Sequence, residues 1–111
     1  MADIRVTITS NRELIEQASD EAVARALEAI GLQAEGYAKM KCPVDPGNLR
    51  NSITHTTDAD GKKEYISTNV EYAAYVEYGT QKTKAQPYLK PAVVNHVDEY
   101  RQIAEYFLKN G

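Results

Sequence analysis

YAAYVEYGTQKTKAQPYLKPA, the stretch from Tyr72 to Ala92, decides how the second half of this chain folds. Its first residues place Tyr72, Tyr75 and Val76 at i, i+3 and i+4, so these three side chains share one face of a helix. A glycine after such a run commonly ends the helix, because glycine adopts left-handed backbone angles without strain. The stretch therefore predicts a short helix that ends at Gly79.

The rest of the stretch is a polar loop followed by two prolines. Residues 80–86 include no bulky apolar side chain, and we expect this loop to be mobile in the isolated subunit and to become ordered on assembly. Proline is tolerated in the first turn of a helix, so Pro87 or Pro91 begins the last helix. The prolines also restrict the backbone around Tyr88 and Leu89. Two interpretations stay open for this pair: burial in the subunit core, or contact with an adjacent subunit.

Hydrophobic spacing predicts a strand and a long helix near the N-terminus. Apolar and polar residues alternate over residues 4–9, which is the period of a half-buried strand. The run SNRE, residues 10–13, is a capping box and predicts a helix from there to about Lys41. Interior glycines at Gly31 and Gly36 indicate close backbone packing or a bend. The apolar stripe of this helix is mostly alanine, at Leu14, Ala18, Ala22, Ala26, Ile30, Ala34 and Ala38.

A turn, a hairpin and a final helix complete the predicted fold. Pro43 ends the long helix, and residues 48–51 suit a single helical turn. Asp58 to Gly61 is typical of a hairpin turn between strands at residues 52–57 and 64–68. The last helix is expected to bury Val93, Val97, Tyr100, Ala104 and Phe107. Since amphipathic helices must bury their apolar faces, we predict one α+β domain over residues 1–111, with a small antiparallel sheet of about three strands packed against the N-terminal and C-terminal helices.

Composition is typical of a globular domain. Hydrophobic residues make up 42% and charged residues 26% of the 111 residues, and the formal net charge is -3. A free-standing DNA-binding domain usually has a basic excess, which this chain lacks. No apolar run approaches the 18 residues of a membrane span, so we expect no membrane partner. The single cysteine excludes a disulfide within the chain, which fits a reducing compartment.

Residues capable of chemistry are present but form no recognisable set. His55 and His96 lie in different predicted elements, whereas zinc needs three or four converging ligands. A site of His55 with Asp58 or Asp60 can be imagined, but a solvated strand histidine is the more typical role. Cys42 is expected to be a small, partly buried residue, because a nucleophile would need a base and an orienting group. The sequence thus predicts no catalytic, metal or cofactor site, no cofactor and no enzymatic activity.

Tyrosines and lysines are the candidates for contact surfaces. Tyrosine is enriched at interfaces because it buries a large ring while keeping a polar tip. Tyr72 and Tyr75 share one helical face, which is more typical of the core, and contact with a neighbour stays open as the alternative for both. Tyr78 is off that face and is expected near the surface. A small basic cluster follows, at Lys82, Lys84 and Lys90. This cluster is either a solvated loop or a surface that faces DNA or an acidic neighbour.

Three sequence runs carry a family resemblance. GNLRNSI (Gly47–Ile53) comes shortly after CPV, YAAYVEYGT spans Tyr72–Thr80, and PYLKPA spans Pro87–Ala92. Together and in this order they resemble the small neck and tail-component proteins of tailed bacteriophages and prophages, over roughly residues 10 to 108. Pro46 departs from the family pattern, which usually has threonine before the glycine, so a hydroxyl cap is not expected at that turn.

The resemblance implies a structural virion component without enzymatic activity. Such a protein would form part of an oligomeric head–tail connector or tail-completion ring, a homo-oligomer that also contacts other neck, portal or tail proteins. DNA would pass through its channel without sequence-specific binding. The protein would be located in the virion, after assembly in the bacterial host cytoplasm. The alternative is a small nucleic-acid-binding or regulatory protein, with tyrosines for stacking and lysines for phosphate contacts.

The motif runs also supply the predicted interface and motif residues: Gly47, Leu49, Arg50, Tyr72, Tyr75, Glu77, Tyr78, Gly79, Thr80, Lys82, Lys84, Pro87, Tyr88, Leu89 and Pro91. Within this set we predict a charge-assisted contact between Arg50 and Glu77. The reason is that the predicted fold brings together the two segments that flank the hairpin.

Overall fold

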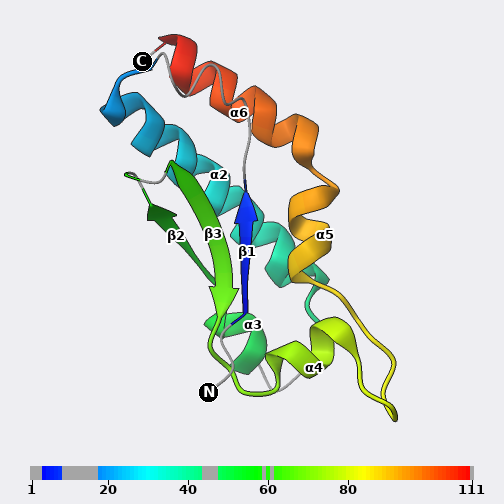
Figure 1. Cartoon of the computed structure of the whole chain (residues 1–111). Helices are drawn as coiled ribbons and strands as arrows, with labels where there is room; N and C mark the ends of the chain where they lie inside the picture. Colours follow the sequence, from blue (N-terminus) through cyan, green and yellow to red (C-terminus); the bar gives the residue numbers. More distant parts are fainter. Residues whose placement is uncertain (1–3, 9–17, 44–47, 59, 61, 111) are drawn as a thin grey trace.

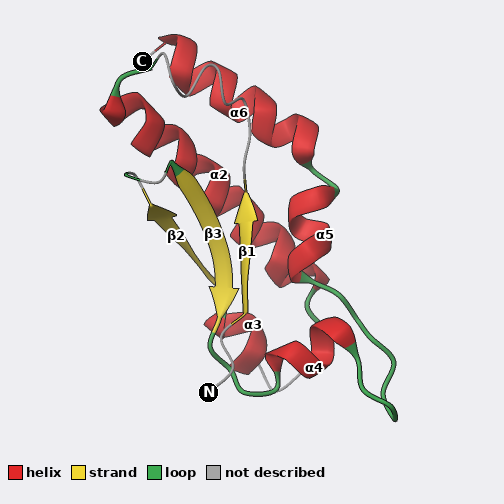
Figure 2. Ribbon diagram, in the orientation of Figure 1, coloured by secondary structure: helices red, strands yellow, loops and turns green. Residues whose placement is uncertain are grey.

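The computed structural model describes residues 4–8, 18–43, 48–58, 60 and 62–110 (Figure 1). The molecule is elongated, with extents of 48 × 25 × 22 Å. The combination of helices with an antiparallel sheet confirms the predicted α+β class (Figure 2). In chain order the elements are β1 (Ile4–Ile8), α2 (Asp20–Lys41), α3 (Asn48–Ser52), β2 (Thr54–Asp58), β3 (Lys63–Thr68), α4 (Ala73–Tyr78), α5 (Leu89–Val94) and α6 (Val97–Asn110).

The described sheet has the strand order β1-β3-β2, so the second strand of the hairpin is central. Ile66 of β3 pairs with Val6 on one side and with His55 on the other. The predicted hairpin is confirmed, because β2 and β3 are antiparallel and Asp58 pairs with Lys63 next to the turn. The first hairpin strand begins later than predicted because α3 continues through residue 52.

The long helix α2 carries the predicted alanine-rich stripe. Its described part begins at Asp20, where the hydroxyl of Ser19 accepts a hydrogen bond from the amide of Ala22 at 3.1 Å. The prediction of one continuous helix from residues 10–13 is wrong, because Ser19 is an extended N-cap that starts the helix at Asp20. Residues 10–13 themselves lie outside the described residues. The helix ends at Lys41, as predicted. Its buried residues are mostly small: Ala22, Val23, Ala26, Leu27, Ile30, Gly31, Ala34 and Ala38.

Small residues allow α2 to approach the sheet closely. A side-chain carbon at Gly31 would lie 1.9 Å from Oε2 of Glu64 on β3, whereas one at Gly36 would meet no atom within 4 Å. The prediction of close packing is therefore confirmed for Gly31. Any larger residue there would require Glu64 to move.

The helices α2, α5 and α6 lie on one side of the sheet, and α3 and α4 lie at one end of it (Figure 1). α2 contacts β2 and β3, α5 contacts α2 and β1, and α6 runs along α2. The core between these elements unites residues from almost every segment, among them Ile30, Leu49, Ile53, Ile66, Tyr88, Leu89 and Tyr100. No described helix is long and apolar enough to cross a membrane.

The prediction of one continuous last helix is wrong. A turn at Asn95–His96 separates α5 from α6. Val97, the first residue of α6, is 43% exposed instead of buried, and Phe107 is only half-buried. The other predicted core positions are confirmed: Val93, Tyr100 and Ala104.

Candidate interaction surface

Residues 72–86, here called the arm, comprise α4 and the loop that follows it. Gly79 ends α4 with φ +80°, and a side-chain carbon there would lie 2.7 Å from the backbone nitrogen of Ala85. The loop folds back on the helix: the amide of Thr80 donates to the carbonyl of Thr83, and the amide of Gln86 donates to that of Val76, both at 2.8 Å. Glycine is needed at position 79 because the backbone is left-handed and the loop packs directly against it.

One buried carboxylate fixes the arm to the core. Glu77, on α4, is 3% exposed and accepts hydrogen bonds from the amides of Tyr88, Leu89 and Lys90 at 3.0, 2.9 and 3.1 Å. These amides open α5, and the first amides of a helix have no partner within it. Tyr88, at the N-cap, makes no side-chain capping bond. Glu77 therefore caps the N-terminus of α5 from another helix. A negative charge is also stabilising there, because that end of the helix dipole is positive.

The predicted contact between Arg50 and Glu77 is wrong. The carboxylate of Glu77 is occupied by backbone amides, and the guanidinium of Arg50 donates to the carbonyl of Cys42 at 3.3 Å. No ion pair among the described residues joins the two. Sequence reasoning missed the capping role of Glu77, although one signal was present: α5 begins without a serine, threonine, aspartate or asparagine that could cap it.

Tyr88 and Leu89 belong to the subunit core, which decides between the two interpretations left open by the sequence. Both are completely buried, and the phenol of Tyr88 donates to the carbonyl of Ala73 at 3.2 Å. Burial raises the pKa of the Tyr88 phenol far above its usual range. In this fold neither side chain is accessible to a neighbour.

The tyrosines of α4 have different surroundings from those predicted. Tyr72 is half-buried and packs against the core, whereas Tyr75 is 62% exposed, so its predicted core position is wrong. Tyr78 is 69% exposed, as predicted. The expected helical face was misassigned because Tyr72 lies just before the first residue of α4.

A hollow of about 440 Å³ lies between the arm and residues of the α2–α3 region. Its apolar lining is supplied by Pro43, Leu49, Tyr72, Tyr75 and Val76. Its polar lining comes from the loop, through Thr80, Thr83, Lys84 and Gln86. An apolar depression with a cationic edge suits an apolar side chain that has an acidic group beside it.

The remaining predicted interface residues are distributed over surface and core. Gly47 lies outside the described residues. The buried members are Leu49, Glu77, Tyr88 and Leu89, and the half-buried ones are Tyr72, Gly79 and Pro91. The exposed members are Arg50, Tyr75, Tyr78, Thr80, Lys82, Lys84 and Pro87. The prediction that the loop is mobile before assembly stays a prediction.

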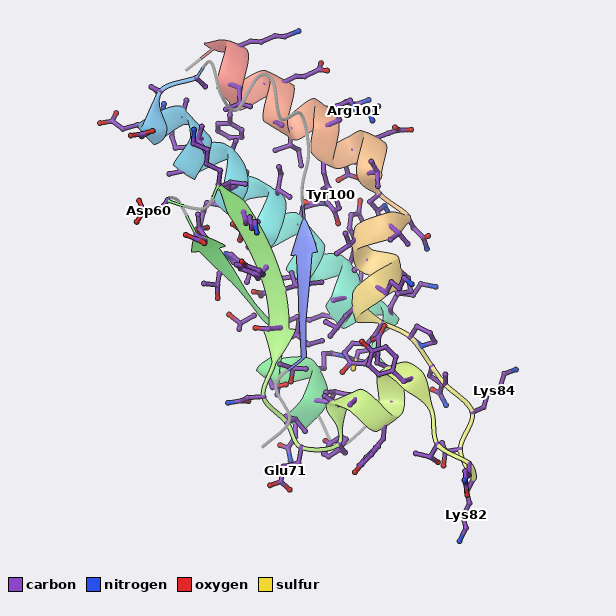
Figure 3. The ribbon with its side chains drawn as sticks, viewed as in Figure 1. Asp60, Glu71, Lys82, Lys84, Tyr100 and Arg101 are labelled. Carbon is purple, nitrogen blue, oxygen red and sulfur yellow. The ribbon has the colours of Figure 1, made fainter. Side chains whose placement is uncertain are left out.

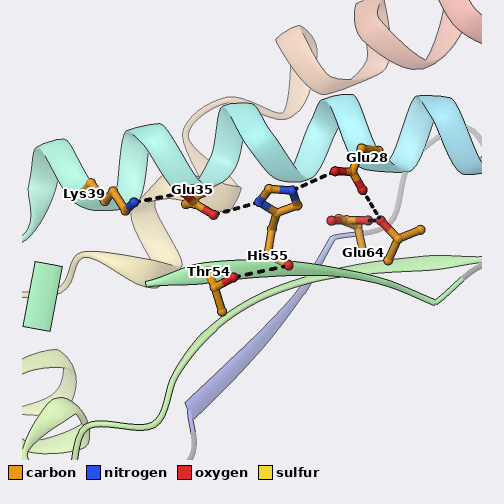
Figure 4. A network of polar contacts seen from close by, with 7 residues as sticks. Glu28, Glu35, Lys39, Thr54, His55 and Glu64 are labelled. Atoms are coloured by element: carbon orange, nitrogen blue, oxygen red, sulfur yellow. Dashed lines mark hydrogen bonds and ion pairs between the residues drawn. The ribbon is translucent and has the colours of Figure 1, made fainter. Parts of the chain in front are cut away.

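A separate polar cluster joins α2 to the hairpin (Figure 4). His55 lies between two helix carboxylates, with Nδ1 2.7 Å from Glu35 and Nε2 3.2 Å from Glu28. Burial lowers the pKa of His55, but the hydrogen bonds to the two carboxylates outweigh this effect and raise the pKa overall. The predicted solvated histidine is therefore wrong, because His55 holds β2 against α2.

Glu64 lies beside this histidine and is completely buried. The hydroxyl of Thr57 is 2.7 Å from Oε1 of Glu64 and 3.1 Å from Oε2 of Glu28, and Oε2 of Glu64 has no hydrogen-bond partner. Burial raises the pKa of Glu64 to about 7. A neutral Glu64 fits this geometry, because its carboxyl can donate a hydrogen bond to the Thr57 hydroxyl. Thr57 can then donate its own hydrogen bond to Glu28.

The polar cluster serves to hold the fold together. Among the described residues, no group of three or more histidine, cysteine, aspartate or glutamate side chains could hold a metal ion. Cys42 is buried, more completely than the partial burial predicted. The arm, with its exposed tyrosines and lysines, is therefore the better candidate for a functional surface.

Comparison with protein families identifies the motif runs. A family model described as "HK97-gp10_like: Bacteriophage HK97-gp10, putative tail-component" matches residues 6–79, about two thirds of the chain. The chain belongs to the HK97-gp10-like family. The match includes the runs around α3 and α4, whereas PYLKPA lies beyond it. No curated protein and no solved structure matches this HK97-gp10-like chain at a significant level.

The three runs meet at one end of this HK97-gp10-like protein. The first run supplies Leu49 to the floor of the hollow, and the second supplies Tyr72, Tyr75 and Val76 to its walls. The third run opens α5 and is bonded to the second through Glu77. Residues far apart in the sequence thus build a single connected support for the arm.

Proposed function

We propose that this protein is a structural, non-enzymatic component of the head–tail connector or tail-completion ring of a tailed phage or prophage. Family membership supports the tail-component role. The observation that favours a ring is the convergence of the three motif runs on the arm, where the exposed Tyr75 lines a hollow and Tyr78 is exposed on the same helix. A surface of this kind, carried on a connected support, suits repeated contact with other protein subunits.

In this proposal the role of the protein is mechanical. Copies of the subunit associate through head-to-tail contacts that close into a ring. The ring contacts portal, neck or tail proteins, and DNA passes through its channel without sequence-specific binding. Assembly takes place in the host cytoplasm, and the protein remains in the virion.

Deleting the gene from a producing phage or prophage tests this function. We expect filled heads and separate tails in electron micrographs, and intact particles once the protein is supplied from a plasmid. Gold-labelled antibody should mark the junction between head and tail. Normal infectious particles without the protein would contradict the proposal.

A gel-shift assay distinguishes the alternative role. The formal net charge of -3 disfavours general nucleic-acid binding. We therefore expect no shift of single- or double-stranded DNA at physiological salt. A strong shift, together with normal particles from the deletion, would favour a nucleic-acid-binding or regulatory protein instead.

A further inference from the structure

A convex corner forms where α5 meets α6, at residues 94–98. Val94 is 53% and Val97 is 43% exposed, although both are apolar, and the Asp98 side chain is 90% exposed. Two apolar side chains and one carboxylate are thus exposed within five residues around a tight turn. Contiguous exposed apolar groups beside a charge are typical of contact surfaces.

The corner is held in shape by contacts with α2. The ring of His96 stacks on Tyr37, with centroids 3.6 Å apart and an angle of 2° between the planes. The phenol of Tyr37 donates to Oε1 of Glu99 at 2.5 Å. Because these contacts are already formed in the subunit, presenting the corner to a partner costs little conformational entropy.

The corner and the hollow of the arm are complementary in chemistry. The hollow is concave, with an apolar lining that includes Tyr75 and Val76 and a cation at Lys84. The corner is convex, with two valines and a carboxylate. Asp98 forms an exposed ion pair with Arg101 at 3.3 Å. Exposed ion pairs contribute little to stability, so the Asp98 carboxylate can also interact with a second cation.

The two surfaces cannot meet within one subunit. The arm extends from one end of the molecule, with Lys82 and Lys84 pointing outward, while the corner lies at the far end of α5, near Arg101 (Figure 3). Contact between different patches of identical subunits is heterologous, which is the type that generates rings.

We propose that the corner of one subunit docks into the arm hollow of the next, with Val94 and Val97 against Tyr75 and Val76 and with Asp98 facing Lys84. This inference rests on the proposed ring function and names the surfaces that form the ring. A single corner in a hollow of this size is a small contact. Purified subunits therefore associate weakly, and full rings form on a portal or tail template.

Disulfide trapping at high protein concentration tests the contact. In a Cys42→Ala background, one variant carries Tyr75→Cys and another carries Val97→Cys. After mild oxidation, the mixture should yield a linked dimer faster than either variant alone. A chain with both substitutions should yield a ladder of longer products, because each copy links to the next in the same direction.

Matched variants control for chance collisions. Leu32 is 62% exposed on α2, so Leu32→Cys mixed with Val97→Cys measures background linking. Lys84→Glu should slow specific linking, Asp98→Lys should slow it equally, and the two changes made in opposite partners should restore it. Lys109→Glu, on an exposed lysine elsewhere, should leave the linking rate unchanged. Thermal melts confirm that each variant is folded.

The outcomes separate this contact from the function on which it rests. Linking no faster than the Leu32 control overturns the docking contact. If rings are then still seen in particles, the proposed function stands and another surface forms them. If Lys84→Glu reduces DNA binding in a gel shift while linking is unchanged, the arm faces nucleic acid and the docking contact is likewise overturned.

Discussion

Replacing Glu77 with alanine tests whether one carboxylate fixes the arm to the core. Glu77 is 3% exposed and accepts three backbone amides at the start of α5, at 2.9–3.1 Å. A hydrogen bond to a charged group contributes about 1.5–3 kcal/mol, and a buried amide without a partner costs about 1–3 kcal/mol. Since these terms are not additive, we expect Glu77→Ala to lower the free energy of unfolding by about 3–5 kcal/mol.

Urea unfolding followed by circular dichroism measures this effect. Glu77→Gln retains one acceptor oxygen, so its stability should lie between those of the parent and Glu77→Ala. Glu71→Ala is the matched control, because Glu71 is an exposed carboxylate just before α4, and its loss should change stability by no more than about 0.5 kcal/mol. If Glu77→Ala and Glu71→Ala unfold at the same urea concentration, the capping argument is refuted.

Further predictions concern the cluster under the hairpin and the arm. The folded-state pKa of Glu64, about 7, is above its ordinary value of 4.5, so its contribution to stability is complete below pH 4.5 and is lost as the pH rises through 7. Because of this group, the free energy of unfolding measured in urea should be up to about 3 kcal/mol higher at pH 5 than at pH 9. Glu64→Gln should reduce this difference, and an unchanged difference would count against a neutral Glu64. Gly79→Ala should cost at least about 1 kcal/mol in a thermal melt, because its backbone is left-handed and a methyl group would meet Ala85; an unchanged melt would contradict the observed turn. Tyr88→Ala should cost about 3–5 kcal/mol while Tyr75→Ala leaves the melting temperature almost unchanged, and equal losses would be inconsistent with their burial. Amides between the two hydrogen-bonded ends of the loop, residues 81–85, should exchange rapidly in the isolated subunit and slowly after assembly, so slow exchange before assembly would disprove loop mobility.

Local patterns predicted most of the secondary structure. The alanine stripe of α2, the turn at α3 and the hairpin each depend on residues close in sequence, so spacing and turn residues were sufficient. The break between α5 and α6 was missed because Asn95 and His96 fit a helical pattern as well as a turn. The His96 ring stacks on Tyr37, far away in sequence, and this contact stabilises the turn.

The candidate site was only partly predictable. The sequence correctly predicted that α4 ends at Gly79 and that Tyr78 is exposed, whereas the role of the nearby lysines stays a prediction. It assigned Glu77 to the wrong partner, because a carboxylate can bond equally well to a guanidinium or to backbone amides. Which of them is within reach depends on how α4 and α5 pack.

The sequence by itself determined the α+β class, the hairpin, the C-terminal ends of the long helix and of α4, and membership in a family of phage tail components. These follow from periodicity and short motifs, which act over a few residues. Only the tertiary structure decided that Glu77 caps α5, that His55 holds the hairpin to α2, and that Tyr88 is buried while Tyr75 is exposed. Each of these depends on contacts between residues at least ten positions apart or on burial between packed layers, and neither leaves a local pattern in the chain.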